Sequence, residues 1–430
     1  VLLASAPGAP LRREVMLRWS GAGLNLLTLP TADELLAPGS PALPRQVRLE
    51  DLLGRTPVQL DAQGLASLFS GQTVLVTGAG GSIGAELCRQ VAAFEAAHIT
   101  MCDFSETSLF EIDRELGETC PGLSRKAALV DVRNAARVAA CFNREKPDLV
   151  FHAAALKHVS MVEHHPCEGV LTNVIGTWNV AESARVSGAA QMVLISTDKA
   201  VDPSNVMGAT KRLAEAVIAA QQTGDGARFS AVRFGNVLAS AGSVVPIFKS
   251  QIERGGPVTV THPDMKRFFM TIPEAAQLVL HATAASAEGV ATHSRLFLLE
   301  MGEPVRIMDL AKQMIALSGR TLGRDIEIEV TGLRPGEKLT EALLDETERA
   351  VPCAPKVMEV VSNSALRIAR SHLLDLEALA ELALRSVALP GAAPIVMVDC
   401  VEHLDLIESV LGSQASPVRL CLDLDSALWA

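Results

Sequence analysis

The sequence contains no tyrosine, and aromatic residues make up only 3% of its 430 residues. No stretch approaches the ~20 consecutive apolar residues that a membrane helix needs, and no signal peptide begins the chain. Acidic residues outnumber Lys and Arg by 49 to 38, for a net charge of -11. Affinity for a phosphate polymer comes largely from clustered Lys and Arg. We therefore expect a soluble chain that does not bind nucleic acid and makes no membrane contact of its own.

The eight cysteines are scattered, with no C-x-x-C pair and no dense framework. This distribution is typical of buried thiols in a reducing compartment. The four histidines between residues 152 and 165 lack an accompanying constellation of cysteines or carboxylates. We therefore expect no metal site.

Size and composition indicate a packed globular chain with two or three structural units, since 49% of the residues are hydrophobic and 20% are charged. Residues 11–36 show a helix, strand and helix pattern, and 37–47 are rich in Pro and Gly. Because the chain begins with Val1 and nothing precedes this pattern, we interpret residues 1–46 as the remnant of an upstream domain plus a linker. Residues 361–430 indicate a separate α/β tail of unknown role.

Short β-branched strands alternate with helices over residues 47–235, reading VLVTG, HITMCD, AALVDV, DLVFHAAA, MVLIST and FSAVRFG. This alternation predicts an α/β fold of the Rossmann type, a doubly wound parallel sheet covered on both faces. The alternation weakens after residue 235, and residues 236–360 are expected to form a smaller C-terminal lobe that binds substrate. Ligands in such folds lie beyond the carboxyl ends of the strands.

A glycine-rich turn follows the strand VLVTG and precedes the helical segment AELCRQVAAF. Glycines at a spacing of three let the chain turn tightly and let a pyrophosphate approach main-chain N–H groups. Asp103 ends the next strand, where a carboxylate binds ribose hydroxyls and repels a 2′-phosphate, so NAD is favoured over NADP. The Asp-Val pair that ends the third strand is expected beside the adenine. The predicted cofactor-binding residues are Gly78, Gly81, Ser82, Ile83, Gly84, Asp103, Asp131, Val132 and Lys211.

Polar side chains gather after the strand MVLI. The sequence Ser-Thr-Asp-Lys occupies residues 196–199, and Met207 and Lys211 follow after a loop that contains proline. Positions 207 and 211 are one helical turn apart and therefore face the same way. A hydroxyl, a carboxylate and two ammonium groups thus converge at the carboxyl end of one strand.

This arrangement resembles the extended short-chain dehydrogenase/reductase superfamily, in which Ser or Thr, Tyr and Lys occupy these places; here Met207 stands at the Tyr position. The chain is further similar to the nucleotide-sugar 4,6-dehydratases of bacterial polysaccharide and glycan biosynthesis, of the large membrane-anchored type with Met in place of Tyr. The resemblance covers about residues 47–350 and departs at Thr340 and beyond about residue 380. It rests on HAAALKHVSMVEHHP (152–166), TNVIGTWNV (172–180), STDKAVDPSNVMGATKR (196–212), RFGNVLASAGSVVP (233–246), RFFMTIPEA (267–275) and LRPGEKLTEALL (333–344).

The resemblance implies a hydro-lyase that dehydrates a UDP-N-acetylhexosamine, such as UDP-N-acetylglucosamine, to the UDP-4-keto-6-deoxy sugar. Hydride leaves C4 for NAD, water is eliminated across C5 and C6, and hydride returns to C6, so a tightly bound NAD is recycled. The resemblance also implies a homo-oligomer whose full-length form is membrane-anchored. It places the activity at the cytoplasmic face of the bacterial inner membrane.

By resemblance, Lys199 is the base for the C5 proton and Asp198 the acid for the leaving 6-hydroxyl. These roles require a neutral amine beside a neutral carboxyl, the reverse of their states in water, at a cost of up to ~9 kcal/mol. Burial favours both neutral forms, so we expect the site to close over sugar and cofactor. Met207 has no proton to exchange, and our hypothesis is that Thr197 and Lys211 relay the proton of the 4-hydroxyl.

Cationic side chains are needed against the two phosphate charges of a UDP-sugar in an acidic protein, and Lys157, Arg267 and Arg334 are the candidates. Asn236 and Glu337 are predicted to contact the substrate as well. Asn173 is expected to brace the strands near the site instead of touching a ligand.

Two alternatives stay open. A UDP-sugar 4-epimerase or decarboxylase would use the same scaffold, but the adjacent Asp198 and Lys199 favour dehydration, because 4-epimerisation requires no elimination. A non-catalytic dinucleotide-sensing scaffold is suggested by the missing Tyr, whereas retention of the other polar residues argues against it. Neither the exact UDP-sugar nor inversion at C5 is fixed by these residues.

Overall fold

The computed structural model describes residues 2–3, 27–29, 44–46, 51, 62–222, 226–287, 294–362, 395–398 and 419–422. Most of the expected upstream remnant and of the tail therefore lies outside the described residues. In the described parts of these regions, β1 (Leu2–Leu3), β2 (Leu27–Thr28) and β3 (Arg45–Gln46) form a small sheet, and β19 (Ile395–Val398) pairs in parallel with β20 (Arg419–Leu422).

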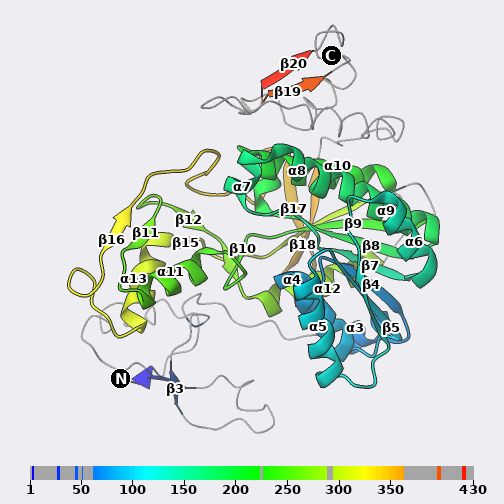
Figure 1. Cartoon of the computed structure of the whole chain (residues 1–430), viewed down its shortest axis with the longest axis horizontal. Coiled ribbons are helices and arrows are strands. Elements are labelled where there is room, and N and C mark those ends of the chain that lie inside the picture. Colours follow the sequence, from blue (N-terminus) through cyan, green and yellow to red (C-terminus); the bar gives the residue numbers. More distant parts are fainter. Residues whose placement is uncertain are drawn as a thin grey trace.

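A nine-stranded sheet forms the centre of the molecule (Figure 1). Its strands are β4 (Thr73–Thr77), β5 (His98–Asp103), β6 (Arg125–Leu129), β7 (Leu149–His152), β8 (Gln191–Ile195), β9 (Arg228–Arg233), β14 (Arg295–Leu299), β17 (Glu348–Ala354) and β18 (Val357–Ser362). Seven of them are paired in parallel in the order β6-β5-β4-β7-β8-β9-β14. The antiparallel hairpin of β17 and β18 extends the β14 edge, where β18 pairs antiparallel with β14. This is the doubly wound order, which reverses between β4 and β7, and the predicted α/β Rossmann-type fold is confirmed.

Helices cover both faces of this sheet (Figure 1). On one face lie α3 (Ala62–Phe69), α4 (Ser82–Ala93), α5 (Glu106–Thr119) and α12 (Ile272–Ala287); on the other lie α6 (Ala135–Glu145), α9 (Gly176–Ser187) and α10 (Val206–Gln221). Strand β4 shows why its apolar run is continuous. Val74 and Val76 pack into the core under the first group of helices, and Leu75 packs into the core under the second. A strand buried on both faces needs apolar residues at every position.

A smaller lobe stands beside the carboxyl ends of the strands and has its own apolar core, which includes Phe248, Leu310 and Ile315. It contains α11 (Val244–Glu253) and α13 (Ile307–Leu317), and three strand pairs. The pairs are β10 (Asn236–Val237) with β13 (Phe269–Met270), β11 (Val258–Val260) with β16 (Ile328–Val330), and β12 (Lys266–Arg267) with β15 (Val305–Arg306).

The span of 236–360, expected as one lobe, contributes to both bodies. Helix α12 and strands β14, β17 and β18 return to the large sheet, where Leu278 and Phe297 are fully buried in its core. The chain leaves the lobe twice, first for α12 and β14 and then for β17 and β18. The apolar side chains of these segments are buried in the core of the large sheet. Among the helices of the described residues, none has the length and apolar character to cross a membrane.

Candidate active site

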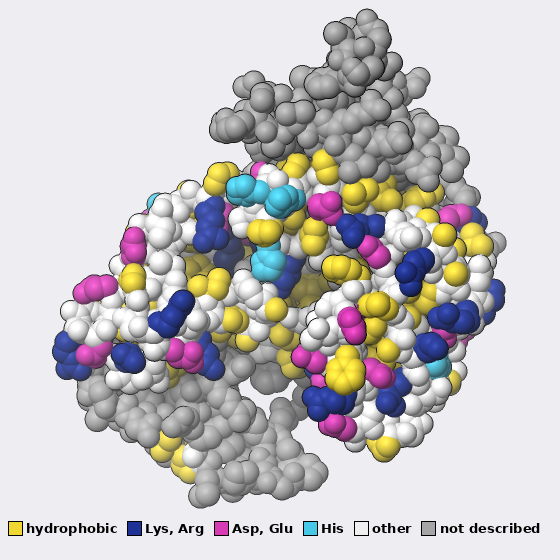
Figure 2. Space-filling model, in the orientation of Figure 1, with side chains coloured by type: hydrophobic (Ala, Val, Ile, Leu, Met, Phe, Trp, Pro, Cys, Tyr) yellow, Lys and Arg dark blue, Asp and Glu magenta, His cyan; other side chains and the backbone are white. Residues whose placement is uncertain are grey.

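A cavity of about 570 Å³ lies between the carboxyl ends of the strands and the lobe. Figure 2 shows the hollow between these two bodies. Turns after β4, β7 and β8 line it from the sheet, and strand β10 with Asn236, strand β12 with Arg267 and the loop with Arg334 line it from the lobe. It brings together most of the predicted site residues: Gly78, Gly81, Ser82, Ile83, Gly84, Lys157, Thr197, Lys199, Met207, Lys211, Asn236, Arg267, Arg334 and Glu337.

The glycine turn after β4 fits a dinucleotide. Gly78 has a φ of +66°, and a Cβ there would lie 2.5 Å from the main-chain nitrogen of Ala154. A Cβ at Gly84 would overlap the carbonyl oxygen of Gly78, so strand and helix meet too closely for any side chain. Helix α4 begins at Ser82, and its first N–H groups lack partners within the helix. Ser82, Ile83 and Gly84 line the cavity, and N–H groups at a helix N-terminus are suited to bind a pyrophosphate.

Asp103 lies at the end of β5 and is already bonded to the glycine turn, since its Oδ2 accepts a hydrogen bond of 2.9 Å from the N–H of Gly80. It lines a second cavity of about 630 Å³ that shares Gly81 with the first. Arg89 in that cavity donates to Glu115 at 2.6 and 2.9 Å and to Glu86 at 3.0 Å. This cation is therefore engaged by carboxylates.

Asp131 and Val132, expected beside the adenine, line neither of these two cavities. Asp131 accepts hydrogen bonds of 2.6 and 2.9 Å from the guanidinium of Arg133, which hold its pKa below the usual range. Val132 is buried, and a Cβ on Gly176 would lie 2.7 Å from its Cγ2. Their role toward the adenine stays a prediction.

Thr197, Asp198 and Lys199 follow β8 and open a short 3-10 turn (Asp198–Ala200). The carboxylate of Asp198 is fully buried, and its Oδ1 accepts hydrogen bonds of 2.9 Å from both Lys199 Nζ and Thr197 Oγ1. Lys199 Nζ also donates to Asn236 Oδ1 at 3.1 Å. Thr197 and Lys199 form the cavity wall, and Asp198 lies behind them. Among the described residues, Asp198 Oδ2 has no hydrogen-bond partner.

Met207 and Lys211 lie in the first two turns of α10, and both are buried. Met207 packs against Val162 and Val206. Lys211 Nζ donates to the carbonyl oxygen of Ile195 at 2.6 Å. Burial lowers the pKa of Lys211 to about 8, so the ammonium form still predominates at physiological pH but a minor fraction of the amine is neutral.

A buried chain of hydrogen bonds behind the site was not predicted. Thr177 Oγ1 donates to the carbonyl oxygen of Asn173 at 2.6 Å, so it accepts from His152 Nε2 at 3.0 Å. The other ring nitrogen, Nδ1, then accepts from Thr77 Oγ1 at 2.6 Å. Burial and the charge of Lys211 lower the pKa of His152 to about 3, which keeps this ring neutral.

Asn173 continues this chain toward the cavity. Its Oδ1 accepts from the N–H of Leu156 at 2.8 Å, and its Nδ2 donates to the Leu156 carbonyl at 3.0 Å and to Thr210 Oγ1 at 2.9 Å. Asn173 therefore holds the segment after β7 against α10. Asn173 was expected to brace the strands, but the bonds that the structure describes join a loop to a helix.

The predicted substrate residues come from two sides. Lys157 lies after β7, and loss of water around it lowers its pKa. On the lobe side, Arg267 donates to the carbonyl oxygens of Lys266, Leu339 and Lys338, at 2.7, 3.2 and 2.8 Å. Two nitrogens of its guanidinium are thus already hydrogen-bonded to main-chain carbonyls of the protein. Arg334 and Glu337 lie on the loop that Arg267 holds.

A cluster of charges under the site was also missed. Arg233 is fully buried and donates to Glu215 at 2.7 and 2.8 Å and to Glu348 at 2.7 Å. Glu215 accepts a further bond of 2.6 Å from Ser196 Oγ. The arginine inside the apolar run SAVRFG could have indicated this cluster, because a charge in a buried strand must be paired with an opposite charge.

Strand order, glycine turn and polar residues after β8 define a Rossmann-type fold of the short-chain dehydrogenase/reductase class. A solved structure of this fold is DesIV (dTDP-glucose 4,6-dehydratase) from Streptomyces venezuelae with NAD and TYD bound. The match has a TM-score of 0.54 at 20% identity and covers 64% of this chain and 88% of that one, which shows the fold alone.

A family model described as "polysaccharide biosynthesis protein" matches residues 74–361, and the chain belongs to this family. The probable polysaccharide biosynthesis protein EpsC of Bacillus subtilis is 49% identical over 338 residues, which are 78% of this chain and 56% of that protein. A UDP-glucose 4-epimerase of Rickettsia bellii is 33% identical over 290 residues, 66% of this chain and 80% of the relative.

The solved structure of Pen from Bacillus thuringiensis matches with a TM-score of 0.61 and 31% identity, covering 72% of this chain and 99% of that one. The chain spans about half the length of the curated relatives that it matches at 49% identity, with 56% of EpsC and 54% of the Staphylococcus aureus protein CapD.

Proposed function

We propose that the chain catalyses the NAD-dependent dehydration of a UDP-N-acetylhexosamine to the UDP-4-keto-6-deoxy sugar for polysaccharide biosynthesis. The observation that carries this proposal is the bonded pair of Lys199 and Asp198 at the cavity. Elimination of water across C5 and C6 needs a base for the C5 proton and an acid for the leaving 6-hydroxyl, whereas 4-epimerisation includes no elimination and needs a proton acceptor only for the 4-hydroxyl. Membrane anchoring and homo-oligomerisation of a longer protein rest on the family resemblance.

NAD fits the residues of the glycine turn better than NADP does. A 2′-phosphate near Asp103 would face this carboxylate and that of Glu86, while the cation of Arg89 is already paired. When bound, NAD would supply the hydride acceptor for C4 of the hexose and the hydride donor for C6. The protein supplies the cradle of N–H groups and the exclusion of water.

Lys199 and Asp198 carry out the elimination in this proposal. The amine of Lys199 at the wall removes the C5 proton, and the carboxyl of Asp198 supplies a proton to the leaving 6-hydroxyl. Because Asp198 lies behind the wall, its proton travels through the hydroxyl of Thr197, which bonds to the same Oδ1. The 2.9 Å contact between Lys199 and Asp198 then returns the proton from amine to carboxylate.

The 4-hydroxyl loses its proton to a relay of Thr197 and Lys211 in this proposal. Both side chains line the cavity, and the low pKa of Lys211, about 8, leaves a usable fraction of neutral amine. Met207 at the same helix start supplies an apolar wall. A thioether cannot exchange a proton, so the chemistry of this step falls to its neighbours.

The charge of the cavity favours a diphosphate. Its lining has five Lys or Arg side chains and two glutamates, although the whole chain carries a net charge of -11. Lys157 from the sheet side and Arg334 from the lobe side are the cations that we assign to the phosphates, with Arg267 holding the loop. The seven charged lining residues are Lys157, Lys199, Lys211, Arg267, Arg334, Glu337 and Glu341.

The deciding experiment incubates the protein with NAD and UDP-N-acetylglucosamine and analyses the product by mass spectrometry. We expect a product lighter by one water, with deuterium at C5 when the reaction runs in D₂O. An isomer of unchanged mass would identify a 4-epimerase, and bound NAD without turnover would identify a sensing scaffold.

Variants of Lys199 and Asp198 test the acid–base roles proposed for these two residues. Lys199→Met should lower kcat by about 10²–10⁴-fold, the usual contribution of acid–base catalysis, with NAD affinity unchanged. Lys249→Met, on the exposed face of α11, is the matched control. A double variant with Ala at 198 and 199 that forms the keto-sugar at the wild-type rate would exclude the mechanism.

A further inference from the structure

The segment 332–341, between β16 and β17, crosses the cleft between the lobe and the large sheet. Most of its residues are exposed and none belongs to a helix or strand. From the lobe, the N–H of Lys266 donates to the Leu339 carbonyl at 2.8 Å, and Arg267 donates to the carbonyls of Lys338 and Leu339. The position of the segment therefore depends on a few bonds to its main chain.

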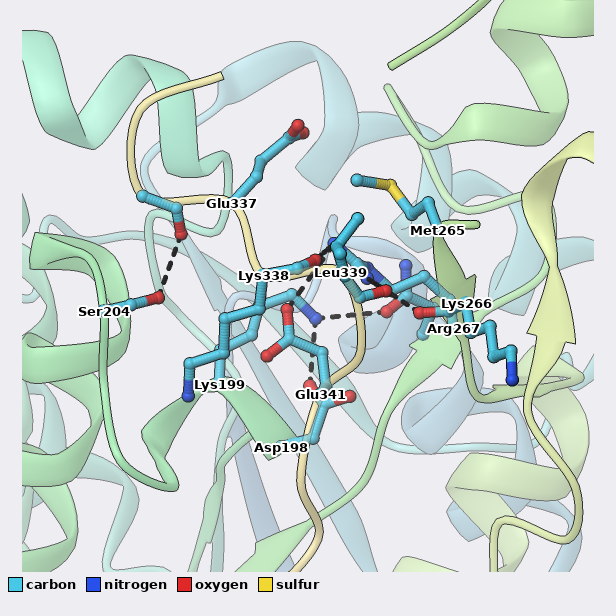
Figure 3. A network of polar contacts seen from close by, with 12 residues as sticks. Asp198, Lys199, Ser204, Met265, Lys266, Arg267, Glu337, Lys338, Leu339 and Glu341 are labelled. Carbon is cyan, nitrogen blue, oxygen red and sulfur yellow. Dashed lines mark hydrogen bonds and ion pairs between the residues drawn. The ribbon is translucent and has the colours of Figure 1, made fainter. Parts of the chain in front are cut away.

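Three further side chains attach the segment to the loop before α10; one belongs to the segment and two belong to the loop. Lys338 Nζ donates to the carbonyl oxygens of Val201 and Asp202, the first at 3.1 Å. Ser204 Oγ and Asn205 Nδ2 both donate to the carbonyl oxygen of Gly336, at 3.1 and 3.0 Å. Figure 3 shows the bond from Ser204 and the path of the segment past Lys199 and Arg267. The ammonium of Lys338 is thus a fastening group and not a phosphate ligand.

Asn205 differs from Ser204 and Lys338 because it also bonds to the start of α10. Its Oδ1 accepts from the N–H of Gly208 at 2.7 Å, which makes Asn205 the N-cap of α10. The first turns of α10 contain Met207 and Lys211. Gly336 has a φ of +76°, and a Cβ there would lie 2.7 Å from the Cβ of Asn205, so the two backbones approach closely. One amide group therefore joins the segment to the start of the catalytic helix.

We propose that Asn205 is a positioning residue that couples segment 332–341 to the N-terminus of α10. The segment carries Arg334 and Glu337, so the coupling transmits the arrival of the nucleotide diphosphate to the helix that holds Lys211. The role of the segment in binding rests on the proposed function. The bonds from Asn205 to both elements do not depend on it.

Asn205→Asp separates the two bonds of this side chain. A carboxylate still accepts from the N–H of Gly208 and is as good an N-cap as asparagine. It has no N–H for the Gly336 carbonyl and faces that oxygen with an acceptor. Asn134→Asp is the matched control, because Asn134 caps α6 by accepting from the N–H of Arg137 at 3.0 Å. Ser204→Ala removes the neighbouring donor alone.

The measurement is hydrogen exchange of residues 206–211 and 332–341, with and without UDP, alongside the affinities for UDP and NAD. In the wild type we expect UDP to slow exchange in both segments. In Asn205→Asp, exchange in 332–341 without UDP should be at least about tenfold faster. The Kd for UDP should rise about tenfold, which corresponds to ~1.4 kcal/mol. UDP should no longer protect 206–211, while NAD affinity and Tm stay at the control values.

The coupling is overturned if UDP protects 206–211 in Asn205→Asp as it does in Asn134→Asp, or if exchange in 332–341 is the same in these two variants without UDP. A wild type that binds NAD but shows no protection by UDP would count against the proposed substrate instead. The comparison of the two variants without UDP then still decides whether Asn205 joins the segment to α10.

Discussion

Met207 occupies the position of the proton-exchanging tyrosine in the superfamily that the chain resembles. Its side chain is 3% exposed and packs between valines at the wall of the cavity, in the place where the dehydrogenases that the chain resembles have a phenol. Thr197 and Lys211 line the same cavity and carry groups able to exchange a proton. In the proposed mechanism, the proton step therefore falls to Thr197 and Lys211, and Met207 keeps the cavity wall apolar.

Met207→Tyr tests this assignment. Because the relay does not need the methionine, the variant should keep at least the wild-type kcat, and the new hydroxyl beside Lys211 should raise it by up to about tenfold. Met207→Phe is the matched control, with the same ring and no hydroxyl. Steady-state rates of keto-sugar formation decide the question. Complete loss of activity in the tyrosine variant alone would show that the thioether has a role of its own.

Lys211 sets a pH dependence. Burial lowers its pKa to about 8, so the fraction of neutral amine increases as the pH rises through this value. If the neutral amine takes the proton, kcat/KM rises between about pH 7 and 9, and Lys211→Arg, which stays cationic, has no such rise. A pH–rate profile of both proteins measures this. A rate that falls above pH 8 in the wild type would assign the work to the ammonium form.

At the scale of elements, the contact between β4 and α4 tolerates no side chain. A Cβ at Gly84 would enter the space of the Gly78 carbonyl group. Gly84→Ala should therefore push the helix from the strand, lower stability by about 1–3 kcal/mol and weaken NAD binding at least tenfold. Gly122→Ala is the control, since nothing lies within 4 Å of a Cβ there. Thermal unfolding and NAD titration of both variants should separate them.

Most strands of the sheet could be predicted from the sequence, because burial on both faces demands an unbroken apolar run, as in β4 and β8. The bounds of the edge strand β6 were harder to predict. The apolar segment AALVDV suggested residues 127–132, but β6 runs from Arg125 to Leu129, since charged residues are tolerated at an edge. The two-residue strands of the lobe, such as β12, exist through pairing with β15, which no local pattern reveals.

Contacts among site residues that are close together in the sequence could be predicted, whereas contacts that form only in the folded chain could not. The glycine turn and the group at 196–211 are local in sequence, and each carries its geometry in its spacing. That Arg267 bonds main-chain carbonyls of residues 338 and 339 depends on how the lobe folds over the sheet. His152 shows the same limit, because its partners Thr77 and Thr177 are 75 and 25 residues away.

At the scale of the whole molecule, buried charges join strands β9 and β17 to helix α10. Burial alone would raise the pKa of Glu215, but the charge and hydrogen bonds of Arg233 outweigh it and hold this pKa below the usual range. Arg233 also bonds Glu348 at the start of β17. The sheet, α10 and the returning chain thus share one ionic network, and removing a single partner would leave a buried charge.

Glu215→Gln should lower the free energy of unfolding by about 3–5 kcal/mol near neutral pH. A carboxylate with a lowered folded pKa contributes stability above its ordinary pKa, and this contribution disappears as the pH falls through the folded value. The difference between wild type and variant should therefore shrink as the pH falls below 4.5. Denaturant titrations from pH 7 to 3 measure it. Glu118→Gln, in an exposed ion pair with Arg114, should change little at any pH.

The bond between Asp103 and the N–H of Gly80 has a consequence for how the cofactor arrives. The group that would receive the ribose is already attached to the turn that would receive the phosphates, so both halves of the receptor are pre-organised. Little ordering entropy remains to be lost on association. Differences in affinity among dinucleotides should then be expressed mainly in how slowly each one dissociates.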